Sequence, residues 1–112
     1  MVERVNISSG APWEPIAGYS RAVRVGQFIE VAGTTAVDAQ GNFYGEGDVV
    51  AQTQYVLEKI QRAIEQAGGT MSDVVRTRIF VTERENMMEV AKVHGKFCLL
   101  YTSDAADERL SV

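Results

Sequence analysis

Apolar and polar residues alternate in two neighbouring segments in the first third of the chain. Residues 22–25 and 28–34 both show this alternation, and Gly26 lies in the short connection between them. A period of two places successive side chains on opposite faces of a strand. The pattern therefore predicts a β-hairpin, and a shorter apolar run predicts a first strand over 3–7, followed by an irregular stretch.

A helical period replaces the alternation after Asp48. Apolar or small residues recur every three or four positions, at Val49, Thr53, Val56, Ile60, Ala63 or Ile64, and Ala67. Asp48 suits the N-cap because its carboxylate accepts hydrogen bonds from the first unpaired amides. Gly68 and Gly69 can adopt positive φ and end the helix without strain.

Alternation returns over residues 74–82, and a second helical period follows it. Thr82 and Glu85 fit a capping box at the start of that helix. Its apolar face is expected at Met87, Val90, Ala91, His94 and Phe97.

The resulting order of elements is strand, strand, strand, helix, strand, helix. It predicts an α+β two-layer sandwich, in which a mixed β-sheet carries two helices on one face. The other face would hold apolar residues such as Phe28 and Phe80. An uncovered apolar face of this kind predicts association with another subunit.

Composition limits the classes of function. The 112 residues suffice for one domain, and a net charge of −4 disfavours binding to nucleic acid. No apolar run reaches the ~20 residues that cross a bilayer, and the first residues lack a leader pattern. We therefore expect a cytoplasmic protein without membrane contact. Cys98 and His94 are single residues of their types, which excludes an internal disulfide and the usual zinc site.

Several segments in succession resemble the Rid family, the YjgF-like reactive-intermediate deaminases. They are AGYSR at 17–21, VRVGQFIEVAG at 23–33, and residues 56–68, 72–83 and 94–97. The resemblance implies a chorismate-mutase-like fold and a homotrimer with clefts between neighbouring subunits. It also implies hydrolysis of 2-iminobutanoate or 2-iminopropanoate to a 2-oxo acid and ammonia, with no cofactor and no metal.

Tyr19 and Gly33 match substrate-binding positions of the family. A glycine late in a strand weakens it unless a ligand approaches the backbone there. The alternatives are a bulge or tight packing at Gly33, and an ordinary half-buried aromatic ring at Tyr19.

The chain also departs from the family pattern. Ala32 stands where many active members have a serine, so one hydroxyl is lost. The family's carboxylate-binding arginine and its C-terminal glutamate have no matching segment, and Glu108 and Arg109 do not inherit their roles. We expect one Rid-like domain over 1–97 that lacks the closing C-terminal strands. Residues 98–112 would form an atypical tail, either non-native or a divergent natural ending.

These departures predict a weak or inactive imine deaminase, and no catalytic residue is assigned. The alternative is a non-catalytic trimeric module that binds a small molecule or a partner, and an endoribonuclease is less favoured. His94 is expected to be a packed or surface residue rather than a proton donor. Arg76 and Arg78 are interpreted as solvated or interface charges, and Cys98 as an inert thiol.

Overall fold

A computed structural model describes residues 3–98 and shows an antiparallel sheet of three strands in these residues. Its strands are β1 (Arg4–Ile7), β2 (Ala22–Val25) and β3 (Phe28–Val31), in the order β1-β2-β3. Ala22 pairs with Ile7 on one side and with Val31 on the other. The predicted first strand and hairpin are confirmed, although β3 ends three residues earlier than expected.

A short helix, α1 (Trp13–Ala17), occupies part of the stretch predicted to be irregular. Pro15 is tolerated because it lies in the first turn, where a helix does not need its N–H. The helix ends at Gly18, whose φ of 77° lets its N–H return to Glu14 O at 2.9 Å.

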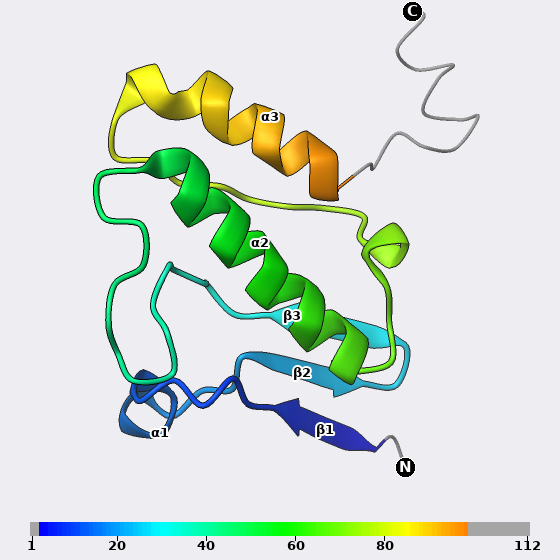
Figure 1. Ribbon diagram of the computed structural model, residues 1–112. Coiled ribbons are helices and arrows are strands. Elements are labelled where there is room, and N and C mark those ends of the chain that lie inside the picture. The colour runs from blue at the N-terminus through cyan, green and yellow to red at the C-terminus, as the bar shows by residue number, and fades with distance from the viewer. Residues whose placement is uncertain (1–2, 99–112) are drawn as a thin grey trace, which may run out of the picture.

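The predicted long helix is confirmed as α2 (Val49–Gln66), which lies across the sheet (Figure 1). The Asp48 side chain accepts from Ala51 N at 3.0 Å, as its N-cap position requires. Ala63 and Ala67 form a buried cluster with Ile7 and Ala22. These small side chains let α2 approach the sheet closely.

The second predicted helix exists as α3 (Met87–Phe97), but it packs beside α2 rather than over the three strands (Figure 1). Val93 joins Leu57 of α2 in a second buried cluster. The expected apolar face is only partly correct, since Val90 is buried but Ala91 is exposed.

The α+β class is confirmed, but the expected mixed sheet is not. Residues 74–82 form no strand, and an extended segment forms a ladder only where another strand runs beside it. None of the described strands does so. The segment instead leads from a 3-10 turn, Met71–Asp73, to a second one, Arg84–Asn86.

The capping box also lies elsewhere than predicted. No side chain caps Arg84–Asn86 or α3, whereas Thr70 and Asp73 satisfy each other's amides around the first 3-10 turn. The proposed tail cannot be compared with the structure, since residues 99–112 lie outside the described part.

Phe28 is exposed on the sheet, as predicted, whereas Phe80 is exposed on a segment that is not part of the sheet. Phe28 is 76% exposed on β3, and Phe80 is 86% exposed on the extended segment. Ile29, the neighbour of Phe28, instead packs on the core between the sheet and α2. The hairpin therefore has one buried face and one face, with Phe28 on it, that residues 3–98 do not cover.

Gly95 offers a direct test of the α3 helix. A Cβ at this position would meet nothing within 4 Å of the described chain. Glycine in a helix interior costs roughly 0.5–1 kcal/mol relative to alanine. We expect Gly95→Ala to raise the free energy of unfolding in urea by about that amount.

Gly68→Ala is the matched control at the end of α2. Gly68 has a φ of 96°, and a Cβ there would lie 2.5 Å from Arg24 Nη1. The free energy of unfolding of this variant should fall by at least about 1 kcal/mol. Equal effects of the two substitutions would contradict the helical assignment of residue 95.

Candidate functional site

A buried arginine joins the two residues that the sequence assigns to substrate binding. Arg21 is only 3% exposed, and its Nη1 donates to Gly33 O and to Thr34 Oγ1, both at 2.7 Å. Its Nη2 donates to the Tyr19 hydroxyl at 3.2 Å, and its guanidinium carbon lies 5.3 Å from the centre of the Tyr19 ring. Tyr19 and Gly33 are thus held together through one side chain.

The environment of Gly33 does not by itself require a glycine. A Cβ built at this residue meets nothing within 4 Å of the described chain, and its φ is not positive. Arg21 engages the Gly33 carbonyl, whereas within residues 3–98 the Gly33 amide donates to no acceptor. Neither a left-handed turn nor tight packing in this part of the chain explains the glycine.

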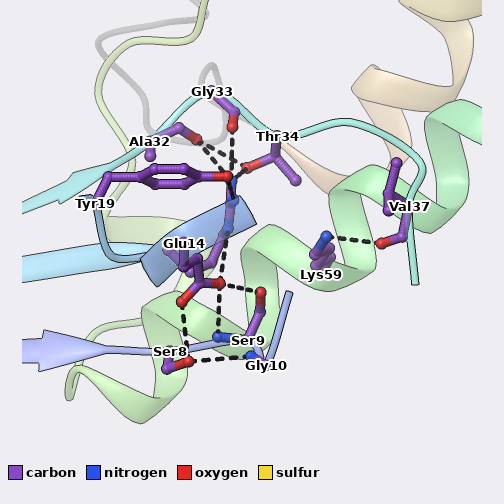
Figure 2. A network of polar contacts seen from close by, with 11 residues as sticks. Ser8, Ser9, Gly10, Glu14, Tyr19, Ala32, Gly33, Thr34, Val37 and Lys59 are labelled. Atoms are coloured by element: carbon purple, nitrogen blue, oxygen red, sulfur yellow. Dashed lines mark hydrogen bonds and ion pairs between the residues drawn. The ribbon is translucent and has the colours of Figure 1, made fainter. Parts of the chain in front are cut away.

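Glu14 faces the same arginine at its Nε, and Figure 2 shows the Glu14 carboxylate beside Ser8 and Ser9. Its carboxylate accepts from Ser8 Oγ at 2.9 Å, from Ser9 N at 3.1 Å and from Ser9 Oγ. Its Oε2 is 4.0 Å from Arg21 Nε, which has no hydrogen-bond partner among the described residues.

Opposing effects set the protonation of Glu14. Burial alone would raise the pKa of this carboxyl, but hydrogen bonds from Ser9 and Ser8 and the charge of Arg21 together lower its pKa. Glu14 is therefore charged at neutral pH and faces Arg21 as an anion.

Lys59 is a second buried cation near this network. It is 8% exposed, and its Nζ donates to Val37 O at 2.8 Å, as Figure 2 shows. Burial lowers the pKa of Lys59, and the neighbouring charge of Arg21 lowers it further.

The structure places the other candidate residues outside this network. His94 on α3 shares a hydrogen bond of 2.8 Å with Thr77, in agreement with a packed or surface histidine. Arg76 and Arg78 are exposed. Cys98 is buried, and burial raises the pKa of its thiol, as expected for an inert cysteine.

Glu14, Arg21 and Lys59 did not emerge as candidates from the sequence. The burial of Lys59 could have been predicted from the sequence. It lies four residues before Ala63 and eight before Ala67, so it shares the buried face of α2. Glu14 and Arg21 had no such signal, since Glu14 lies in a short helix that the sequence did not predict and Arg21 follows that helix.

Two kinds of feature are absent from residues 3–98. No three His, Cys, Asp or Glu side chains gather there as metal ligands. No helix in that range has the length and apolar character to span a bilayer.

Comparison with known proteins gives consistent matches. Residues 9–107 match the family model described as endoribonuclease L-PSP. A RutC family protein of Pyrococcus abyssi is 32% identical over 97 residues, which are 87% of this chain and 76% of that protein.

Solved structures share the fold. A member of the YjgF/YER057c/UK114 family from Mycobacterium tuberculosis is 45% identical, with a TM-score of 0.73 over 84% of this chain and 73% of that one. A protein of unknown function of the Rid family from Yersinia pestis is 28% identical, with a TM-score of 0.74 over 85% and 75% of the two chains.

The Glu14–Arg21 arrangement predicts that Glu14→Gln strongly lowers the free energy of unfolding. The substitution preserves size but leaves the buried guanidinium without its facing anion, and we expect a loss of about 3 kcal/mol near neutral pH. The pKa of Glu14 is lowered in the folded state, so its contribution is complete above the unfolded pKa and disappears as pH falls through the folded one. The difference between wild type and variant should therefore shrink in acid, as measured by urea unfolding at several pH values.

Glu85→Gln is the matched control, because Glu85 is exposed. Its effect should stay within about 0.5 kcal/mol at every pH. A similar loss in both variants, or a pH-independent loss at Glu14, would contradict the role given to this carboxylate.

Proposed function

The chain belongs to the YjgF/Rid family, and from this premise we propose that Tyr19 and Gly33 form one half of a cleft for a small 2-imino acid or a related metabolite. A neighbouring copy of the chain, in a homotrimer, supplies the other half. The chain binds such a ligand and hydrolyses it weakly or not at all.

The geometry of Gly33 is the observation that carries the proposal. Arg21 holds the carbonyl of this residue on one side, while its amide has no acceptor in the described chain. The space that a Cβ would occupy is empty. A ligand that accepts from this amide and lies against the bare Cα accounts for the glycine, since any side chain would take the ligand's place.

The need for a neighbour has separate support. Two hollows in the described chain have volumes of about 200 and 410 Å³, and neither is lined by Tyr19 or Gly33. The exposed Phe28 and Phe80 offer apolar surface for subunit contact.

Weak turnover follows from the charges available near Gly33. Hydrolysis of a 2-imino acid needs a cation for the carboxylate, a donor for developing charge and a positioned water. Arg21 is the nearby cation, but Gly33 and Thr34 engage its Nη1 and Tyr19 engages its Nη2. Ala32 adds no hydroxyl to the site.

RNA is a less favoured substrate, although the matching family model carries the description endoribonuclease. A net charge of −4 opposes binding to a phosphate backbone. The exposed cations Arg76 and Arg78 lie on the extended segment and not among the contacts of Tyr19 and Gly33.

Gly33→Ala tests the cleft without disturbing the fold, because the added methyl meets no described atom. With 2-oxobutanoate as a stable analogue of the imine, wild type should gain thermal stability in proportion to ligand occupancy. Butanoate, which lacks the 2-oxo group, serves as the reference at the same concentration. Gly33→Ala should keep the melting temperature of the unliganded protein and lose the part of the gain that exceeds the gain from butanoate. Gly95→Ala, which also adds a methyl into open space, should retain the gain.

Two further measurements bear on assembly and turnover. Light scattering coupled to gel filtration should report a trimer, and a monomer that still binds 2-oxobutanoate would overturn the shared cleft.

Ammonia release from enzymatically generated 2-iminobutanoate should not exceed the spontaneous rate. A large acceleration that Tyr19→Phe abolishes would contradict weak turnover.

A further inference from the structure

The smaller hollow, of about 200 Å³, lies where α2 passes the end of β1 and the loop around Val37. Its lining combines buried residues, among them Ile7, Lys59 and Ala63, with exposed ones such as Arg62 and Gln66. The hollow therefore has a buried floor and a rim that reaches solvent.

The charges that line this hollow are all positive. Arg21, Lys59 and Arg62 contribute to its wall, and no carboxylate does. Glu14 is the anion that faces Arg21, and its carboxylate accepts hydrogen bonds from Ser8 and Ser9. Such a concentration of cations is unexpected in a chain with a net charge of −4.

Lys59 still has hydrogen-bonding capacity. An ammonium group carries three donors, and Val37 O is the acceptor that the described chain provides for it. Because Lys59 is 8% exposed, bulk water satisfies its remaining donors poorly. An anion in the hollow would satisfy them and offset the cost of burying the charge.

The size and floor of the hollow limit what can enter. A cavity of about 150 Å³ accommodates a benzene-sized molecule, so this one admits a ligand of a few non-hydrogen atoms. Ile7 and Ala63 on the floor can contact a short apolar group, while Arg62 at the rim can form two parallel hydrogen bonds to an oxyanion.

We infer that this hollow binds a small oxyanion, a short-chain carboxylate or a phosphate, between Lys59 and Arg62. The site is distinct from the proposed Tyr19–Gly33 cleft and does not depend on it. Arg21 separates the two, because its Nη atoms hold the cleft residues while the same side chain forms part of the wall of the hollow.

Binding at this site should depend on pH through Lys59. The ionisable groups that line the hollow or act on Lys59 are Glu14, Arg21, Asp38, Tyr55 and Arg62. Burial and the two arginines lower the pKa of Lys59, and Glu14 and Asp38 only partly oppose them. Lys59 therefore loses its proton below the ordinary lysine range, and affinity for an anion should fall as the solution becomes alkaline.

Isothermal titration calorimetry near neutral pH tests the inference, with sodium phosphate in one arm and sodium butanoate in the other. Ionic strength is held constant with sodium chloride. At least one arm should show saturable binding of one anion per chain, and the stronger arm identifies the ligand chemistry. Lys59→Met and Arg62→Gln should each raise the dissociation constant by about tenfold or more.

Three variants control for surface charge, for the proposed cleft and for folding. Lys92→Met removes an exposed cation of α3 and should bind as wild type does. Gly33→Ala should also bind normally, which separates this site from the proposed cleft. Arg62 is exposed, so Arg62→Gln guards against a folding defect in Lys59→Met. The inference is overturned if neither anion saturates, or if Arg62→Gln and Lys92→Met bind alike.

Discussion

Arg21 carries a full positive charge with only 3% of its surface exposed, and a guanidinium cannot escape this burial by losing its proton. Removing such a charge from water costs several kcal/mol unless hydrogen bonds and a facing anion offset it. The offset comes from both sides, from the acceptors of Gly33, Thr34 and Tyr19 and from the carboxylate of Glu14. The course of the backbone around β3 depends on keeping these acceptors in place.

This requirement explains why β3 ends at Val31. Ala32 N still donates to Arg21 O at 3.0 Å, which is the last step of the ladder. Beyond it, the acceptors of Gly33 and Thr34 turn toward the guanidinium instead of toward a neighbouring strand. The Ala32 carbonyl also points toward this guanidinium, with its oxygen 3.4 Å from Arg21 Nη1. In a trans peptide the Gly33 N–H lies opposite that carbonyl, so it points away from Arg21.

The sequence predicts those parts of the fold that depend on local periodicity. The hairpin and α2 follow from alternation, a helical repeat and an Asp48 cap, and the structure contains both. Residues 74–82 carry an equally clear alternation but form no strand, because pairing needs a partner that local pattern cannot supply. The same limit applies to the site. Tyr19 and Gly33 could be proposed from resemblance, whereas the Arg21 contact that joins them spans twelve residues and appears only in three dimensions.

Net charge is an equally incomplete guide to binding. The value of −4 averages over the whole chain and opposes the binding of an extended polyanion. A ligand of a few atoms responds only to the charges within a few ångströms. Lys59 and Arg62 lie three residues apart on α2 with Arg21 across the hollow, so their fields add in a partly desolvated space where solvent screens them weakly. An acidic protein can therefore hold a small anion while excluding a large one, because burial decides which charges act.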